Sequence, residues 1–403
     1  MLGLEKRSTM DIDLQVIKIN LEDNELINIF KEISEINLED EIEYSVMKIT
    51  NISLERKYHG KSITISAKYY NVRKVFSIDL AIGDIVTPSP KIHIYRSVLN
   101  DIQFEILSYP VESILAEKIQ TLIYKGERNS RSKDLLDIHL LEVSGYNSFI
   151  LNSAMINTFF NRGTMYNKNI FKIINDLMNI DRIELLYNNY AKNHIFAKDI
   201  SFNDCKKSIQ KILECLQMKT PINVKDYNIE LHLIRHGKDE PDKLGGWSST
   251  HLINDGIEEV ELLKDQIDDN YDLFVSSDLT RAIETSNILN KKLKMNIDYN
   301  ENFRETNNGD LKDLTKKQFE EKYNGLYYSS LDMNECYPNG ESPNQFYERV
   351  KKAFIQLIES NKNKKILLVT HGGVITVIMC LLYGLPYSNL LKIAPPTGSI
   401  TKF

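Results

Sequence analysis

After residue 229, short apolar runs alternate with longer amphipathic segments, and this pattern leaves few folds open. The runs "IELHLIRHG", "YDLFVSS" and "KKILLVTHGG" have the length and the continuous apolar character of buried strands. Between them, "GIEEVELLKDQI" and "TRAIETSNILNKKL" repeat apolar residues three and four apart, which predicts helices. Such alternation predicts a mostly parallel sheet with helices on both faces. In these sheets, ligands bind beyond the carboxyl ends of the strands.

Polar side chains follow the predicted strands at that edge. Arg235 and His236 end the first strand, and His371 ends the last. Arg281 falls in the first turn of the helix after "YDLFVSS", and Glu305 lies in the polar segment "FRETNNGD". Packing alone rarely places such groups at strand ends in four separate segments, so we interpret them as one site.

This set of residues suits phosphoryl transfer. A phosphoryl group carries negative charge on its equatorial oxygens, and the planar guanidinium groups of Arg235 and Arg281 match that geometry. A neutral imidazole at His236 can attack phosphorus, and His371 can stabilise charge as the bond breaks. A carboxyl group that its surroundings keep neutral can protonate the leaving oxygen, and Glu305 is the candidate.

Residues 229–403 resemble the histidine phosphatase superfamily, also called the phosphoglycerate mutase-like family. The matching motifs are "LIRHG", "SSDLTRAIET", "RETNNGDLKD", "NGES" and "VTHGGVI". The resemblance implies an α/β/α fold, a phosphohistidine on His236, proton donation by Glu305, and no metal or other cofactor. It implies a phosphate pocket made by Arg235, Arg281 and His371. The substrate-binding positions that the motifs carry over are Gly237, Gly246, Trp247 and Gly372, of which Gly246 and Trp247 lie in a loop expected to close over the site.

Two features of this half bear on the reaction. The family often follows its first motif with Glu-Thr and then an asparagine, whereas this chain has "KDEPDKLGGWSS". Only 31 positions separate Gly309 from Gly340 (340 minus 309), fewer than in the mutase branch. We therefore favour a phosphatase that acts on a small phosphorylated substrate. Phosphoglycerate mutase-type phosphoryl transfer is the alternative.

The segment before residue 220 has a different pattern. The runs "IDLQVIKI", "ITISAKYY", "KVFSIDLAIG" and "KIHIYRSV" alternate at period two, which predicts strands. From Pro110 onward, "PVESILAEKIQTLIY", "RSKDLLDIHLLEV", "NSAMINTFF" and "KNIFKIINDLMN" keep apolar residues three and four apart. This order predicts an α+β domain, with a small mixed sheet followed by a helical bundle.

Three carboxylates lie on the predicted strands of this first half. Asp11 and Asp13 are two apart on one strand, so both point to the same face. Asp79 lies on a run that we interpret as a neighbouring strand. Such a group suits Mg²⁺ and a nucleoside triphosphate, and nucleotidyl transfer would follow. By itself, however, an Asp-x-Asp pair is more often a solvated strand face.

The helical segments add further charged residues. Lys118 lies on one predicted helix, and Lys133 and Asp134 lie on the next; we expect these three residues to bind the substrate nucleotide of this half. Residues 3–145 resemble the AbiEii-type nucleotidyltransferase family of bacterial toxin and abortive-infection systems. The resemblance rests on the motifs "RSTMDID", "IDLAIGD", "AEKI" and "RSKDLLDI". The resemblance implies a bound metal and nucleotide, with RNA or protein as the acceptor. The family's Gly-Gly or Gly-Ser turn is not found ahead of Asp11, so a misplaced start, a fragment and a degenerate scaffold all stay open.

Length and charge set the outer limits. A chain of 403 residues exceeds one typical core, and "QMKTPINVKDYN" lacks apolar periodicity. We therefore expect domains at 1–219 and 229–403, joined by a linker at 220–228. The net charge of -6 argues against a dedicated nucleic-acid binder. We expect a cytosolic protein that does not enter the membrane, because signal-peptide and bilayer-spanning segments are missing and the four cysteines form no CxxC pair.

Three functions fit these observations. The first is a phosphohydrolase with an appended nucleotidyltransferase-like domain. The second is a magnesium-dependent, toxin-like nucleotidyltransferase with an accessory phosphatase domain. In the third, the first half is a binding module without enzymatic activity.

Overall fold

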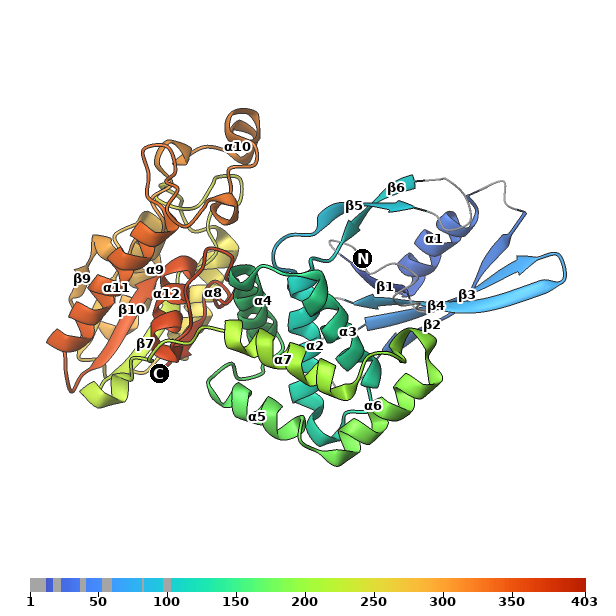
Figure 1. Cartoon of the computed structure of the whole chain (residues 1–403). Helices are drawn as coiled ribbons and strands as arrows, with labels where there is room; N and C mark the ends of the chain where they lie inside the picture. Colours follow the sequence, from blue (N-terminus) through green and yellow to red (C-terminus); the bar gives the residue numbers. More distant parts are fainter. Residues whose placement is uncertain (1–11, 17–22, 37–40, 53–59, 82, 97–102) are drawn as a thin grey trace. The chain divides into compact units, whose positions relative to one another are not determined.

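The computed structural model describes residues 12–16, 23–36, 41–52, 60–81, 83–96 and 103–403 (Figure 1). Contacts divide the chain into two compact units. The first contains residues 1–147, 158–165 and 171–213, and the second contains residues 148–157, 166–170 and 214–403. The second unit therefore takes in two short segments that precede the predicted linker. The predicted domain limits at 219 and 229 stay a prediction.

The first unit contains a mixed four-stranded sheet in the order β1-β4-β3-β2. Its strands are β1 (Ile12–Gln15), β2 (Glu43–Ile52), β3 (Gly60–Tyr69) and β4 (Val72–Ala81). β1 runs parallel to β4, and the other pairs are antiparallel. Helix α1 (Asp23–Ser34) packs Leu26 and Phe30 against Ile63, Ile65 and Leu80 of the sheet. An apolar cluster on one sheet face thus holds this part together.

A ribbon and a helical bundle follow that sheet. Strands β5 (Lys91–Arg96) and β6 (Gln103–Ser108) form the antiparallel ribbon. The helices are α2 (Val111–Lys125), α3 (Ser132–Ser144), α4 (Ser148–Asn161), α5 (Asn169–Leu177), α6 (Asp181–Asn193) and α7 (Phe202–Cys215). Fully buried Leu115, Ile119 and Leu136 show that α2 and α3 pack through the apolar stripes that their spacing predicts.

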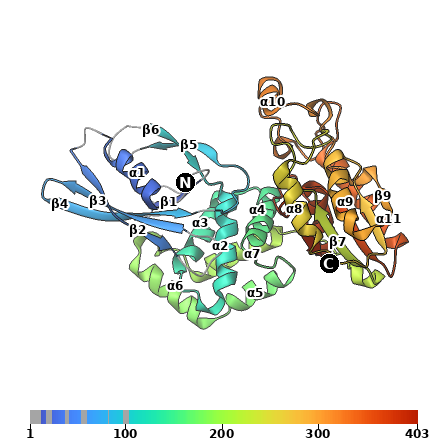
Figure 2. The same ribbon diagram turned by 180° about the vertical axis from the view of Figure 1, so that it is seen from behind.

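The second unit is built on a five-stranded sheet in the order β11-β7-β10-β8-β9. Its strands are β7 (Glu230–Arg235), β8 (Leu273–Ser276), β9 (Ile297–Tyr299), β10 (Lys365–Thr370) and β11 (Ile400–Lys402). Only β11 runs antiparallel to its neighbour. Figures 1 and 2 show α8 (Asn254–Lys264) and α9 (Thr280–Leu293) on one face, and α11 (Pro343–Ser360) and α12 (Gly372–Tyr383) on the other. The chain is therefore an α/β protein of two parts.

Local signals place the helices that carry polar residues. α11 begins at a capping box, in which Ser342 and Gln345 satisfy each other's backbone amides and Pro343 opens the helix. α12 begins directly after His371 and ends at Tyr383. The next residue, Gly384, caps the helix with a φ of 68°, in the left-handed region that favours glycine. Helix α10 (Lys316–Tyr323) lies in the segment between Gly309 and Gly340, before α11. Its Phe319 forms a small apolar cluster with Leu311, Leu331 and Tyr337.

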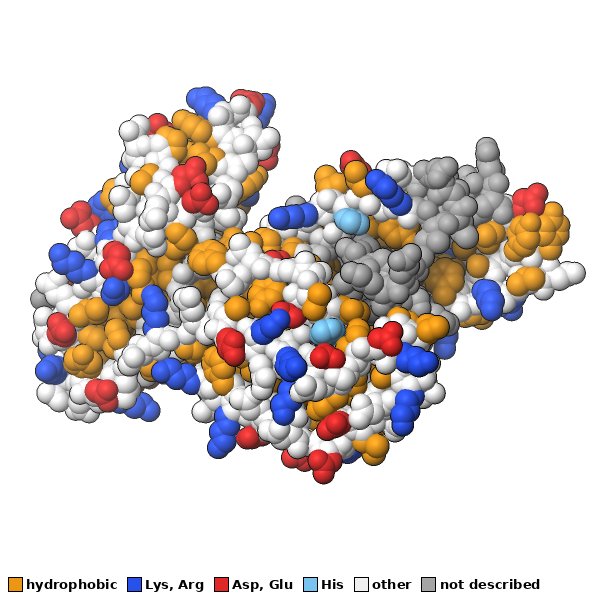
Figure 3. All heavy atoms as spheres, viewed as in Figure 1, with side chains coloured by type: hydrophobic (Ala, Val, Ile, Leu, Met, Phe, Trp, Pro, Cys, Tyr) orange, Lys and Arg blue, Asp and Glu red, His pale blue; other side chains and the backbone are white. Residues whose placement is uncertain are grey.

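The surface adds two observations. Lysine, arginine and acidic side chains are interspersed over the face drawn in Figure 3 and do not gather into a patch of one sign. In the described part of the chain, every helix is too short or too polar to cross a lipid bilayer.

Candidate active site

Two histidines follow the ends of neighbouring parallel strands. β7 ends at Arg235 and β10 ends at Thr370, and these two residues are partners in the strand register. The next residue on each strand is a histidine, so the His236 and His371 rings lie 5.1 Å apart between centroids. The parallel sheet thus brings together two imidazoles that are 135 positions apart in the chain (371 minus 236).

The tautomer of His236 follows from its contacts. Its Nδ1 lies 2.8 Å from the carbonyl oxygen of Gly237, which can only accept, so Nδ1 carries the hydrogen. Nε2 therefore has a lone pair, and the Nε–H of Arg281 donates to it over 3.3 Å. Burial lowers the pKa of His236 to about 3, and the charge of Arg281 adds to this. The structure thus holds a neutral imidazole whose Nε2 carries no proton.

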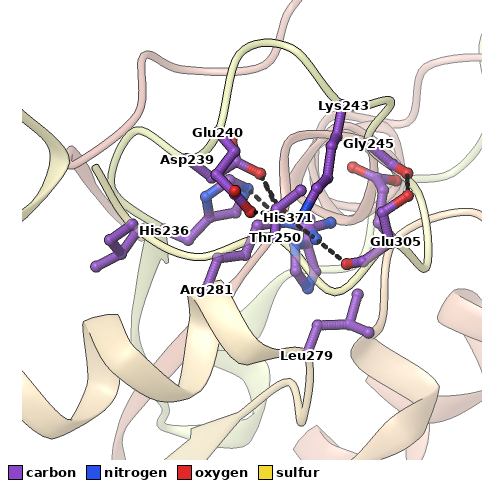
Figure 4. Close-up of polar contacts among 12 residues, drawn as sticks. His236, Asp239, Glu240, Lys243, Gly245, Thr250, Leu279, Arg281, Glu305 and His371 are labelled. Carbon is purple, nitrogen blue, oxygen red and sulfur yellow. Dashed lines mark hydrogen bonds and ion pairs between the residues drawn. The ribbon is translucent and has the colours of Figure 1, made fainter. Parts of the chain in front are cut away.

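Arg281 reaches this imidazole from the first turn of α9 and is 2% exposed. Its guanidinium donates to the carbonyl oxygens of Ser248 at 3.0 Å and Gly246 at 2.7 Å, and to Thr250 Oγ1 at 3.1 Å. Asp239 Oδ2 lies 3.5 Å from its Nε (Figure 4). Asp239 belongs to the segment where the chain departs from the Glu-Thr pattern, so this segment supplies an ion partner for Arg281.

Two buried nitrogen atoms beside these groups make no hydrogen bond with the protein: Nε of Arg235 and Nδ1 of His371. The other side of each group is held in place. Arg235 Nη1 donates to the carbonyl oxygen of Pro395 at 2.8 Å, and His371 Nε2 lies 2.8 Å from Ser277 Oγ. Burial lowers the pKa of His371 well below its usual value, as do the nearby arginines. A polar ligand or an ordered water can satisfy such atoms.

The side chain of Glu305 contacts the first turn of α12. Its Oε2 accepts the backbone N–H of Gly373 at 2.9 Å, and its Oε1 accepts that of Thr306 at 3.0 Å. A Cβ at position 373 would lie 2.2 Å from Oε1, so the close approach requires glycine. The Glu305 carbonyl accepts from Arg349 Nη2 at 3.1 Å, and Arg349 is paired with Glu341 at 2.6 Å. The carboxylate is thus anchored at both its side chain and its backbone.

Of the four substrate-binding positions predicted in the second half, two line the cavity and two do not. Gly246 and Gly372 line the cavity described below. Gly237 packs against α8, because a Cβ there would lie 2.5 Å from the carbonyl oxygen of Gly256. Trp247 lies outside the cavity lining; its indole N–H donates to the Glu305 carbonyl at 2.7 Å, and the Arg304 guanidinium lies over its ring at 4.8 Å. The loop therefore contacts the site through Gly246, while Trp247 supports Glu305.

A cavity of about 450 Å³ opens beside this site. Its lining includes Arg235, Glu305, Gly372 and Gly373, and the remaining lining residues are aromatic, aliphatic, glycine or uncharged polar residues. This volume is within the range of roughly 300–1,000 Å³ that is usual for small-molecule sites.

Several supporting residues had no signal in the sequence. Thr250 and Gly246 anchor Arg281 from a loop more than thirty residues away, and Gly373 anchors Glu305 across 68 positions. Such contacts depend on the fold. Arg349 shows one partial signal, because it follows the "NGES" motif at helical spacing.

The described residues contain one group of side chains whose positions could suit a metal ion. Glu230, His232 and Asp268 place ligand atoms within 4.8 Å of one another, at the opposite end of β7. The ammonium of Lys365 lies 2.9 Å from Glu230 Oε1 and 2.6 Å from Asp268 Oδ2. A lysine thus neutralises these carboxylates.

In the first unit, the predicted metal ligands are placed in part. Asp11 lies outside the described residues. The parallel register of β1 and β4 sets Asp13 directly beside Asp79, and Asp79 Oδ1 accepts from Ser62 Oγ at 2.6 Å. Two of the three predicted positions therefore share one sheet register.

The predicted nucleotide-binding residues lie on α2 and α3. Lys118 Nζ is 3.0 Å from Asp134 Oδ1 and 2.6 Å from Asp137 Oδ2, and Lys133 lies on α3 beside Asp134. The sequence reading overlooked a neighbouring pair of contacts, in which Arg162 lies 3.0 Å from Asp84 and 3.1 Å from Glu117. Burial raises the pKa of Glu117.

Comparisons with known proteins match the two halves of the chain to two different families. The family model for nucleotidyl transferase AbiEii toxin, Type IV TA system, matches residues 1–214, and that for the histidine phosphatase superfamily (branch 1) matches residues 231–403.

Individual relatives match the second half. A 2,3-bisphosphoglycerate-dependent phosphoglycerate mutase of Cytophaga hutchinsonii is 29% identical over 182 residues, covering 42% of this chain and 84% of that protein. The uncharacterized phosphatase PhoE of Bacillus subtilis is 25% identical over 151 residues, covering 36% and 74%. The crystal structure of the alpha-ribazole phosphatase from Shigella flexneri aligns at 26% identity with a TM-score of 0.39, covering 43% and 89%. The chain therefore belongs to the AbiEii nucleotidyltransferase family, whose model matches residues 1–214, and its residues 231–403 match the model of the histidine phosphatase superfamily.

Proposed function

We propose that the second half hydrolyses a small phosphomonoester through a phosphohistidine on His236. The observation that carries this proposal is the pair of buried nitrogen atoms without protein partners, Arg235 Nε and His371 Nδ1, beside the neutral His236 imidazole. A phosphate group satisfies both atoms at once, because its oxygens accept from guanidinium and imidazole N–H groups. It also offers a phosphorus atom to His236 Nε2.

In the first step, the lone pair on His236 Nε2 attacks phosphorus and the bond from phosphorus to the ester oxygen breaks. Protonated Glu305 gives its proton to the departing alkoxide, so a neutral alcohol leaves. Arg281 donates to the imidazole before the reaction and lies where it can accept a phosphoryl oxygen as a new partner. The Nδ1–H bond to Gly237 balances the positive charge that develops on the ring.

In the second step, water attacks the phosphohistidine and passes a proton to the Glu305 carboxylate. The bond from Nε2 to phosphorus breaks, inorganic phosphate leaves, and the imidazole is neutral again. We favour water over a second substrate as acceptor because the short insertion between Gly309 and Gly340 adds no cation to the lining of the cavity. A mutase must hold a second phosphate there.

The test is phosphoenzyme trapping with ³²P-labelled phosphomonoester, read together with phosphate release. The full chain should give an acid-labile, base-stable label, and His236→Ala should give no label and at least about a 10⁴-fold lower rate. His251→Gln is the matched control, since His251 belongs to the same unit but is paired with Glu284 at the surface. Phosphate release without any label on the protein would contradict the proposal.

A second activity has its own supporting observation. We propose that the first half transfers a nucleotide, because the register of β1 and β4 sets Asp13 beside Asp79. These residues would hold Mg²⁺, which orients and neutralises triphosphate oxygens when bound. Lys118, Lys133 and Asp134 would bind the nucleotide.

This second activity is tested with labelled nucleoside triphosphates and with RNA or protein acceptors. Label transfer should need Mg²⁺ and fall at least about 100-fold in Asp79→Ala, while phosphate release by the other half stays unchanged. Label transfer that persists in Asp79→Ala would contradict the proposal. Equal loss of both activities would indicate misfolding.

A further inference from the structure

The cavity beside the phosphate site has an unusual charge distribution. Among its lining residues, all of which are described, Arg235 is the one cation and Glu305 the one acid. Both lie at the phosphate end. The part of the cavity that would receive the alcohol portion of a substrate therefore presents no charged side chain.

Aromatic rings form much of that uncharged part. Tyr328 and Tyr387 join their hydroxyl groups at 2.6 Å, and Tyr328 is nearly parallel to Tyr337, with 6.4 Å between ring centroids. Tyr327 packs against Phe319 at 5.2 Å and keeps 53% of its surface exposed. These rings come from the α10 insertion and from the segment after α12. They offer flat apolar surface to a ligand.

Three polar side chains of the lining already bind the protein. Both hydrogens of the Asn389 amide go to the backbone carbonyls of Tyr328 and Leu331, each at 2.8 Å. The Asn308 amide binds the backbone on both sides, and Thr376 Oγ1 donates to a carbonyl of its own helix. A second negative charge on the substrate would lose water here without gaining a cationic partner, which is costly.

We propose that the substrate's alcohol portion is uncharged and carries a planar ring that lies against these tyrosines. The class is a nucleoside 5′-monophosphate or a similar ring-bearing phosphomonoester. Phosphorylated carboxylic acids, such as phosphoglycerate and phosphoserine, are poor substrates because the cavity offers their carboxylate no cationic side chain. This inference rests on the proposed phosphatase function and adds the identity of the leaving alcohol.

The experiment measures kcat/KM of the full chain for adenosine and uridine 5′-monophosphates, 3-phosphoglycerate, phosphoserine and glycerol phosphate. The nucleoside monophosphates should exceed the two carboxylates by at least about 100-fold. They should also exceed glycerol phosphate, which is uncharged but has no ring. A carboxylate substrate that equals or surpasses the nucleoside monophosphates would overturn the inference.

Two pairs of variants separate the ring from the charge. Tyr327→Ala should raise KM for the nucleoside monophosphates about tenfold and leave glycerol phosphate unchanged, while Tyr327→Phe keeps both values. Leu391→Arg should place a cation in the lining and raise kcat/KM for 3-phosphoglycerate about tenfold, which the uncharged control Leu391→Gln should not do. Equal effects of Tyr327→Ala on both kinds of substrate would contradict a ring contact.

Failure of this inference differs from failure of the proposed function. If no substrate labels His236 and none releases phosphate, the phosphatase proposal itself is wrong. If His236 is labelled but the rates do not depend on ring or charge, only the inference about the alcohol is wrong.

Discussion

His236 combines burial, a fixed tautomer and a neighbouring guanidinium in one side chain. Because its pKa is lowered to about 3, the folded protein keeps the ring neutral across the neutral range. In the unfolded chain, the ring takes up a proton below about pH 6.5. As the pH falls from about 6.5 towards 3, this residue therefore lowers the free energy of unfolding, since only the unfolded state binds the proton.

This is checked by NMR titration of ¹⁵N-labelled histidine. The His236 ring should show no protonation between pH 8 and pH 5 in the folded protein and should titrate near pH 6.5 in urea. A folded-state midpoint between pH 6 and 7 would contradict the assignment of a buried neutral nucleophile.

Gly373 is the second decisive position at this scale. A methyl group at position 373 would collide with Glu305 Oε1, so Gly373→Ala should displace the carboxylate. Proton donation contributes roughly 10²–10⁴-fold, so hydrolysis of alkyl phosphates should fall about 100-fold. Nitrophenyl phosphates, whose leaving group departs as a stable phenolate without protonation, should lose much less activity. A uniform loss for both kinds of ester in steady-state kinetics would argue against this role of Glu305.

Among the elements, α11 stabilises the backbone segment that carries Glu305. Arg349 of this helix binds Glu341 and the backbone carbonyls of Asn302, Arg304 and Glu305. The side chains of Arg349 and Glu341 are 18% and 13% exposed, so removing one leaves a poorly solvated charge. Arg349→Met should lower the free energy of unfolding by about 3 kcal/mol, as measured by denaturant titration.

Lys351 on the same helix provides the control. Its pair with Glu348 is solvent-exposed, at 36% and 62%, so Lys351→Met should change stability by less than about 1 kcal/mol. Equal effects of the two substitutions would show that the network around Glu305 adds nothing to stability.

At the scale of the whole molecule, the second unit draws on helix α4, which precedes the predicted linker. Asn157 is fully buried; its Nδ2 donates to the Leu390 carbonyl at 2.9 Å, and its Oδ1 accepts the Lys392 N–H at 2.7 Å. Leu391, between these residues, lines the cavity. Asn157→Ala should therefore cost about 1–3 kcal/mol and raise KM more than it lowers kcat. The matched control is Asn193→Ala, which removes an exposed contact within a single helix. An unchanged KM in Asn157→Ala would contradict this support.

Regular elements could be predicted where local pattern and packing agree. The segment "TRAIETSNILNKKL" predicted a helix, and α9 has the same limits. β2 was overlooked because a register shift between Val46 and Lys48 breaks its alternation of apolar residues. β6, β9 and helices α1, α6, α7, α10 and α11 were also not identified. Helices α1, α7 and α11 do carry apolar residues at helical spacing, so a local signal for them was present in the sequence.

The residue types for phosphoryl transfer, and their positions after strands, were already present in the linear order of the chain. Periodicity is a local property, so it could indicate where each strand ended and which side chain came next. Tertiary structure alone decided that the His236 and His371 rings lie 5.1 Å apart, that Thr250 and Gly373 hold Arg281 and Glu305, and that tyrosines surround the cavity. The reason is that strand order and long-range packing determine these contacts, and neither depends on spacing along the chain.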